Sequence, residues 1–407
     1  MSSDNSRLAT FGDMARVWDI GSELLSEGVT YPSPVHAGGD LYGGVDLADE
    51  RVAIWVGGHN SGGGSAWETI IADATGDTES TLSVGSTALS TDGTLLAYRV
   101  LEANVPSEDL EGSDAPANAR RVSDVRVIEI DSGEVIAELD APCNAYLIDG
   151  ETMATEGCHG KEGFPEWTRQ WNLRFSNDAS LLVMTDGADS ALTMWDVASG
   201  EVVISDRIPG LGGGYVAFSP DGTLGAALYG GPGAGSAMRI YDLSSFTVTE
   251  EPLVPDGTNG AVFTPDQSLL VTFNFSGHLN YFDTADWSII DQVEAHQGSI
   301  YDIDINPSGT LVASTGEDGV RVWNIADRSL RTDLGFDSVG VSTVRFLDDS
   351  RLLLAPIGNP SAIVITFDPE DLASIGKARV TRAFTETECL TYDIDPCPTT
   401  LEALRGG

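Results

Sequence analysis

A unit of short strands and turns recurs along this chain and limits its fold more than any other feature of the sequence. The last run of the unit ends in an aromatic residue, at Trp195, Tyr241, Phe282 and Trp323, with spacings of 46, 41 and 41 residues. Upstream of most endings lies one kind of turn, in which Pro sets the backbone angle, Asp or Asn caps, and Gly takes the positive-φ position. Its copies read LSTDGTL at 89, FSNDASL at 175, FSPDGTL at 218, FTPDQSL at 263 and INPSGTL at 305.

The runs between the turns have the pattern of strands. In SIYDIDIN, three isoleucines alternate with Asp302 and Asp304, so we expect these two acids to face outward. TLVAST and VRVWN are almost entirely apolar or small, as strands buried on both faces should be. A four-stranded sheet cannot bury two apolar faces alone, whereas sheets stacked around an axis can. Because the period matches the 40–45 residues or so of propeller blades, the sequence predicts an all-β fold, a β-propeller of four-stranded antiparallel blades.

The number of blades follows from a count of the third strand of the unit. This strand occurs eight times, near residues 16–20, 68–74, 124–130, 192–197, 238–243, 279–284, 320–325 and 362–367. Only seven copies have a visible inner strand before them, so we favour seven blades, with a strand around Glu23–Val29 completing the last one. The alternative is eight blades with an incomplete first blade. On the favoured interpretation residues 1–20 are a partial blade left from an upstream region, residues 21–368 form the propeller, and residues 369–407 form a tail.

One unit carries a specific resemblance. Residues 295–324, AHQGSIYDIDINPSGTLVASTGEDGVRVWN, resemble a repeat of the WD-repeat family. In that family one His, one Ser or Thr, one Asp and one Trp form a hydrogen-bonded set within a blade, and the matching positions here are His296, Ser314, Asp318 and Trp323. The resemblance implies that this set is structural; the competing interpretation is a catalytic His-Asp pair. Elsewhere the set is eroded: Asp13 and Trp18 keep their spacing without a matching His.

The C-terminal tail carries a second resemblance. PEDLASIGKARVTRAF (369–384) favours a short helix, and Thr385 with Glu388 fits a capping box. The tail resembles one that follows propellers in multidomain regulatory proteins of actinobacteria, and the matching residues are Arg379, Val380, Thr381, Arg382, Glu388, Cys389, Tyr392, Cys397 and Pro398. The resemblance implies a sensory or scaffolding role in a signalling protein.

The chain has four cysteines, at 143, 158, 389 and 397, which allow three pairings. A hairpin in YLIDGETMAT with its turn at Gly150-Glu151 would place Cys143 opposite Cys158, which suggests a disulfide. Cys389 and Cys397 are candidates for a second disulfide, and free thiols are the alternative for both pairs.

Long insertions fall where the second and third strands of a unit, or two successive units, are joined, and in a propeller these connections lie on one face. Loops on a rigid scaffold often carry function, although insertions in surface loops are also tolerated cheaply. The candidate binding residues on this face are Arg120, Arg121, His159, Lys161 and Trp167. For the two arginines, which lie within an acidic loop, local ion pairing is the alternative.

The chain is strongly acidic, with 63 acidic and 21 basic residues and a formal net charge of −42. Such a surface repels nucleic acids and anionic membranes. We interpret the charge as a solubility trait, and selection of a basic protein partner is the alternative. No apolar run reaches the roughly 20 residues that cross a bilayer, and the N-terminus lacks a secretion signal, so we expect a cytoplasmic protein. The sequence does not predict an oligomeric state.

The usual motifs of catalysis are missing from the sequence. No two of the five histidines have the spacing of metal ligands on one helix, no glycine-rich stretch ends in the Lys-Ser/Thr of a phosphate loop, and there is no nucleophile elbow. We therefore predict no cofactor and favour a non-enzymatic interaction or sensory platform, within a bacterial signalling or regulatory protein. The alternative is a lactonase-like propeller hydrolase with a divalent cation in the central channel.

Overall fold

The computed structural model describes residues 7–11, 15–19, 41–48, 51–59, 65–73, 78–82, 87–103, 120–140, 144–148, 151–156, 171–186, 191–208, 214–230, 235–334, 341–356, 363–368 and 400. These residues form 31 strands, and no helix lies among them. The predicted all-β class is therefore confirmed. The strand around Glu23–Val29 and the tail of residues 369–407 with its short helix lie outside the described residues, apart from residue 400.

Strands that follow each other in sequence pair antiparallel, because each short turn returns the chain beside the strand it has just left. Five sheets have four strands each. The first comprises β3 (Leu41–Leu47), β4 (Arg51–His59), β5 (Ser65–Asp73) and β6 (Thr78–Leu82). The next two comprise β13 (Trp171–Phe175), β14 (Leu181–Asp186), β15 (Ala191–Asp196) and β16 (Val202–Arg207), and then β17 (Tyr215–Phe218), β18 (Leu224–Gly230), β19 (Ser236–Asp242) and β20 (Thr247–Glu250). The last two comprise β21 (Thr258–Phe263), β22 (Leu269–Asn274), β23 (His278–Asp283) and β24 (Ile289–Glu294), and then β25 (Ile300–Ile305), β26 (Leu311–Gly316), β27 (Gly319–Asn324) and β28 (Leu330–Asp333).

Three sheets depart from this pattern. The largest has six strands, namely β7 (Thr87–Leu89), β8 (Leu95–Ala103), β9 (Arg120–Glu129), β10 (Val135–Leu139), β11 (Asn144–Ile148) and β12 (Glu151–Glu156). In it the long strand β9 pairs with β10 along one half and with β11 along the other. A three-stranded sheet comprises β29 (Val341–Phe346), β30 (Arg351–Pro356) and β31 (Ile363–Thr366), and a two-stranded sheet comprises β1 (Arg7–Phe11) and β2 (Ala15–Asp19).

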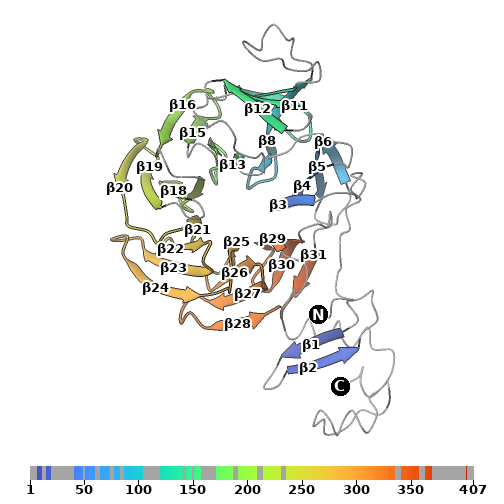
Figure 1. Cartoon of the computed structure of the whole chain (residues 1–407), viewed down its shortest axis with the longest axis vertical. Helices are drawn as coiled ribbons and strands as arrows, with labels where there is room; N and C mark the ends of the chain where they lie inside the picture. Colours follow the sequence, from blue (N-terminus) through green and yellow to red (C-terminus); the bar gives the residue numbers. More distant parts are fainter. Residues whose placement is uncertain are drawn as a thin grey trace.

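The sheets from β3 to β31 surround a common axis, with the first strand of each innermost, whereas β1 and β2 lie outside this ring (Figure 1). Inner strands of neighbouring sheets pack against each other: β3 on β7, β7 on β13, β17 on β21, β21 on β25 and β25 on β29. Strand β14 contacts β17, and β29 and β30 both contact β3, which closes the ring. The predicted propeller is confirmed, while the number of blades remains a prediction.

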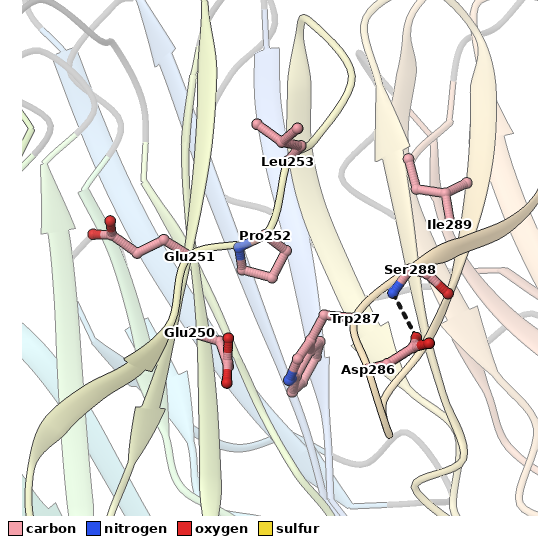
Figure 2. A pocket seen from close by; sticks show the side chains of 8 residues that line it. All are labelled: Glu250, Glu251, Pro252, Leu253, Asp286, Trp287, Ser288 and Ile289. Atoms are coloured by element: carbon pink, nitrogen blue, oxygen red, sulfur yellow. Dashed lines mark hydrogen bonds between the residues drawn. The ribbon is translucent and has the colours of Figure 1, made fainter.

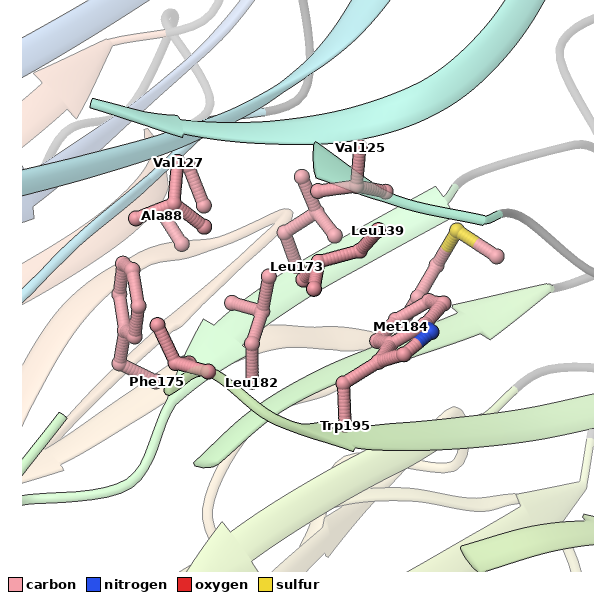
Figure 3. Close-up of a cluster of buried hydrophobic side chains, with 11 residues drawn as sticks. Ala88, Val125, Val127, Leu139, Leu173, Phe175, Leu182, Met184 and Trp195 are labelled. Atoms are coloured by element: carbon pink, nitrogen blue, oxygen red, sulfur yellow. The ribbon is translucent and has the colours of Figure 1, made fainter. Parts of the chain in front are cut away.

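The apolar core lies between sheets rather than within them. One cluster joins Ala88, Val125 and Leu139 of the six-stranded sheet to Leu182 and Trp195 of the next sheet (Figure 3). Five further clusters fill other interfaces between neighbouring sheets in the same way. Each sheet thus depends on its neighbours to keep both faces away from water.

The turn between the first and second strands repeats one hydrogen-bonded pattern. In the copy that contains Gly222, Ser219 Oγ donates to Asp221 Oδ1 (2.8 Å) and accepts from the Leu224 amide (2.9 Å). Gly222 has φ +72°, and the equivalent residues Ala179 (φ 57°) and Gln267 (φ 61°) adopt the same left-handed conformation without being glycine. The geometry of the turn therefore persists where its preferred residue is absent.

Two local expectations are wrong. Asp302 does not face outward: its side chain is buried, and it accepts from the Val344 amide (3.1 Å) and from Arg345 Nη1 (2.5 Å). Asp304 accepts from the Phe346 amide (2.7 Å). Both acids bridge β25 to β29 because amides of an inner strand that face a neighbouring sheet need acceptors.

The second correction concerns the hairpin of β11 and β12. Ile148 pairs with Glu151, so Glu151 belongs to strand β12 and not to the turn predicted at Gly150-Glu151. In the part of the chain that the structure describes, no helix is long and apolar enough to cross a membrane.

Candidate functional site

The sheet of β25–β28 brings together the four residues that the WD-repeat resemblance selects. His296 precedes β25, Ser314 lies on β26, Asp318 lies in the turn between β26 and β27, and Trp323 lies on β27. The pairing of Ser314 with Arg321 across β26 and β27 puts Ser314 beside the strand that carries Trp323. His296 and Ser314 are almost fully buried.

These four side chains form one chain of hydrogen bonds. Trp323 Nε1 donates to Ser314 Oγ (3.1 Å), Ser314 Oγ lies 2.8 Å from His296 Nε2, and His296 Nδ1 lies 2.5 Å from Asp318 Oδ1. Since the indole can only donate, the network assigns the Ser314 proton to His296 Nε2 and the imidazole proton to Nδ1, which donates to Asp318. Burial lowers the pKa of His296, and the hydrogen bond to Asp318 offsets this only in part. The imidazole is therefore neutral at pH 7.

Arg321 completes the charge balance of this network. Its Nη1 donates to Asp318 Oδ2 (2.8 Å) and to the Ala295 carbonyl (2.7 Å), while its Nε donates to Asp333 on β28 (2.9 Å). Burial opposes ionisation of Asp318, but hydrogen bonds from Arg321 and His296 outweigh it and hold the pKa of Asp318 far below its usual range. Asp318 therefore carries its charge between two donors.

A glycine makes room for the imidazole. A Cβ atom at Gly316 would lie 2.7 Å from His296 Nδ1 and 3.0 Å from the Ser299 carbonyl. These distances are shorter than non-bonded contacts normally allow, so any side chain at this position would displace the histidine ring.

The order Ser314–His296–Asp318 has the distances of a nucleophilic triad. Catalysis, however, also requires that the hydroxyl oxygen reach a substrate. Ser314 has none of its surface exposed, and its Oγ already accepts from Trp323. The geometry therefore favours a structural role for this set.

The sheet of β17–β20 holds a different polar cluster at the equivalent place. Asp206 on β16 accepts hydrogen bonds from Tyr229 (2.9 Å), from Tyr241 and from Arg239 Nη1 (2.6 Å). Arg239 Nε also donates to Glu251 (2.8 Å). Burial raises the pKa of both tyrosines well above the usual range, so their hydroxyls stay protonated.

A neutral version occupies the sheet of β21–β24. Asn280 Nδ2 donates to Thr272 Oγ1 (3.2 Å), and Gln292 Nε2 donates to Asn280 Oδ1 (2.7 Å). In the sheet of β13–β16, Met184 takes the position of Ser314, and among the described residues the indole N–H of Trp195 has no hydrogen-bond partner. Four neighbouring sheets thus place different side chains, charged, neutral polar or apolar, at the location that the Ser314–His296–Asp318 set occupies in the sheet of β25–β28.

An open groove of about 390 Å³ lies on the outer rim of the ring, between β20 and the turn that joins β23 to β24. Figure 2 shows its lining, with Trp287 at the base between Pro252 and Asp286. The residues that line it are Glu250, Glu251, Pro252, Leu253, Asp286, Trp287, Ser288 and Ile289. Sequence analysis missed this groove; the one available signal was an aliphatic residue in the short segment Pro-Leu-Val-Pro.

The residues predicted to bind on one face are only partly placed. Arg120 and Arg121 begin β9, opposite Ala103 and Glu102 on β8 and Leu147 and Tyr146 on β11. His159, Lys161 and Trp167 lie outside the described residues, as do the four cysteines. Within the described ranges, no three His, Cys, Asp or Glu side chains are placed to hold a metal ion.

Comparison with known proteins finds distant relatives. The chain is 25% identical over 232 residues to pre-mRNA-processing factor 19 homolog 2 of Arabidopsis thaliana. The aligned region covers 53% of this chain and 40% of that protein. It is also 25% identical over 159 residues to p21-activated protein kinase-interacting protein 1-like of Danio rerio. Here the aligned region covers 38% of this chain and 40% of that protein. Both relatives are WD-repeat proteins. The matches thus span less than half the length of each relative, and no protein-family model matches the chain.

Proposed function

We propose that this chain is a non-enzymatic protein-interaction platform built on a WD-repeat-like propeller. The observation that carries the proposal is the burial of the triad-like set of Ser314, His296 and Asp318, whose Ser314 hydroxyl is inaccessible and already hydrogen-bonded. The relatives support it, since one of them is named for its interaction with a protein kinase. The polar clusters around His296, Asp206 and Asn280 are hydrogen-bonded internally, which leaves the exposed surface for recognition.

The finer parts of the proposal rest on the sequence. They comprise a ring of seven blades closed by Glu23–Val29, a basic partner, a cytoplasmic location, a role in bacterial signalling, and binding by His159, Lys161, Trp167 and the two arginines at 120 and 121. The division at residues 20 and 368 and the two cysteine pairs belong to the same group. No feature of the described residues favours the lactonase-like alternative.

Affinity capture tests the proposal. The tagged full chain is immobilised and exposed to an extract of its own cells, and the retained proteins are quantified by mass spectrometry. We expect at least one protein to be retained near one-to-one and to be displaced by untagged chain. Absence of such a protein, together with tight stoichiometric binding of a divalent cation that raises the melting temperature, would instead support the hydrolase.

A further inference from the structure

The rim groove between β20 and β24 presents an aliphatic side chain to solvent in a fixed direction. Leu253 is 92% exposed, more than any other large apolar residue described. It lies between Pro252 and Val254, and Pro255 follows, so the proline rings restrict the backbone to extended conformations. Because successive side chains of an extended segment point in opposite directions, Leu253 points outward while Val254 packs inward against the buried cluster that Trp287 also contacts.

The base of the groove is equally well fixed. Trp287 packs edge-to-face on Phe263, with 6.4 Å between ring centroids and 81° between ring planes. Its amide donates to the Asp283 carbonyl (2.7 Å), and its backbone holds a positive φ of 59°. Ile289 forms the far wall and is 44% exposed. An apolar surface held this rigidly loses little conformational entropy when a partner binds.

Apart from Pro252 and Ser288, the remaining lining of the groove is acidic. Glu250, Glu251 and Asp286 surround the apolar residues, and no Lys or Arg lines the groove. Hydrogen bonds from Ser288 lower the pKa of Asp286, so this carboxylate stays charged at neutral pH. Glu251 is partly balanced by Arg239, whereas no ion pair within the described residues is recorded for Glu250 or Asp286.

The outer strands of four sheets each carry a half-exposed aliphatic residue, and the groove must be distinguished from this repeated feature. Val202, Val248, Ile289 and Leu330 are all 42–51% exposed, and each pairs with the aromatic residue of its own sheet. That ring of aliphatic residues belongs to the repeat and marks no particular place. Leu253 and Trp287, by contrast, meet only in this groove.

We propose that the groove of Glu250–Leu253 and Asp286–Ile289 binds an extended segment of a protein partner, in which an aliphatic or aromatic residue is flanked by Lys or Arg. The apolar residue lies against Leu253, Trp287 and Ile289, and the flanking cations face the three carboxylates. A second copy of this chain is a poor occupant, because its net charge of −42 repels the acidic rim. This inference rests on the proposed interaction function and names the chemistry of the partner.

Peptide selection on the full chain tests the inference. A phage-displayed library of random 12-residue peptides is selected on the wild type and, in parallel, on Leu253→Ser. We expect peptides enriched on the wild type to carry an apolar residue between basic residues, and to bind Leu253→Ser about 10-fold more weakly. Raising the salt from 50 to 300 mM should weaken binding several-fold, because screening reduces the attraction to the carboxylates.

A matched pair of variants locates the effect. Ile289→Thr changes the groove, whereas Val202→Thr makes the same kind of change at the equivalent position of another outer strand. We expect only Ile289→Thr to weaken the selected peptide. Melting temperatures should be the same for Leu253→Ser and the wild type, since the leucine is exposed.

Three outcomes would overturn the inference: enrichment of acidic or neutral peptides, equal binding to Leu253→Ser, or self-association that Leu253→Ser abolishes in sedimentation experiments. The tests also separate this inference from the proposed function. If the chain captures a cellular partner that Leu253→Ser captures equally well, the groove assignment fails and the interaction function stands. If neither a partner nor a peptide is captured, both fail.

Discussion

The sheets of β25–β28 and β17–β20 solve the same problem with different residues. Each has an arginine two residues before the aromatic residue of its third strand. Arg321 reaches Asp333 at the end of the fourth strand, and Arg239 reaches Glu251 directly after the fourth strand. In the first sheet a histidine and a tryptophan complete the cluster. In the second, two tyrosines surround Asp206.

The difference is greatest at one strand position. Gly316 and Tyr229 occupy equivalent places on β26 and β18, since each pairs with the residue two before the arginine. The histidine ring fills the space beside Gly316, whereas Tyr229 fills its own space and reaches Asp206. In both sheets the space at this position is filled by an aromatic ring, and the hydrogen-bond donors of the cluster have acceptors. The geometry is retained while the residue types change, as expected of architecture rather than of a reaction site.

Removing the tyrosine ring should have the largest effect. Tyr229 is 1% exposed, and we expect Tyr229→Ala to lower the free energy of unfolding by about 3–5 kcal/mol, because it leaves a cavity beside the charged Asp206. Tyr229→Phe keeps the ring and should cost only about 1 kcal/mol. Chemical denaturation measures both, and a loss below 1 kcal/mol for Tyr229→Ala would show that the sheets are not comparable.

Filling the space at Gly316 should have the next largest effect. Gly316→Ala places a methyl group against the imidazole and should cost about 1–3 kcal/mol. In a double-mutant cycle with His296→Ala, that cost should largely disappear, since the ring that clashes is gone. Gly225→Ala on β18 is the control, because the atoms nearest to its Cβ would be those of the Leu243 side chain, at 3.3 Å and beyond. Strict additivity of the two changes would contradict the role assigned to Gly316.

The two sheets should also differ in their response to acid. The folded-state pKa of His296 lies below the ordinary value of 6.5, so its contribution to stability is present above about pH 6.5 and is lost as the pH falls through the folded-state pKa. The advantage of the wild type over His296→Asn in unfolding free energy should therefore shrink between pH 7.5 and 5.5. Burial raises the pKa of Asp304 to about 6, so the contribution of Asp304 to stability changes with pH in the opposite direction. Because Asp304 is present in both the wild type and His296→Asn, this contribution cancels in their difference.

Tyr229→Phe serves as the control for the acid response, because neither tyrosine hydroxyl titrates in this range. Its difference from the wild type should stay constant from pH 7.5 to 5.5. An advantage of the wild type over His296→Asn that grows on acidification would mean that the histidine is charged in the folded protein.

The smallest effects concern the turns. Gly222 in the sheet of β17–β20 and Ala179 in the sheet of β13–β16 hold the same left-handed conformation. Nothing lies within 4 Å of a Cβ at Gly222, so Gly222→Ala should cost about 1 kcal/mol from backbone strain alone. Ala179→Gly should relieve the same strain and raise the free energy of unfolding by about 0.5 kcal/mol. Thermal melts resolve both, and equal signs would contradict the equivalence of the turns.

Much of the ring could be predicted from the sequence because its signals are local. The turns at 89, 175, 218, 263 and 305 each contain their own hydrogen-bonding residues, and the period between aromatic residues reveals the sheets. His296, Ser314, Asp318 and Trp323 could be selected by their resemblance to one repeat. The geometry then shows that they meet.

Other features depend on contacts that no spacing reveals. The cluster around Asp206 combines side chains of two sheets, and its tyrosines resemble ordinary core residues in the sequence. The burial of Asp302 was mispredicted because alternation indicates which residues share a face but not whether a neighbouring sheet covers that face. The rim groove likewise depends on how Val254 packs, which determines that Leu253 is exposed.

The most direct test of the central claim, that the histidine set is architecture, is the free energy of unfolding of His296→Asn at pH 7.5. The imidazole is buried and joins Ser314 to Asp318, so its loss should cost about 2–4 kcal/mol and leave Asp318 with fewer donors. A variant as stable as the wild type, within about 0.5 kcal/mol, would contradict the claim and would return the Ser314–His296–Asp318 set to consideration as a site for chemistry.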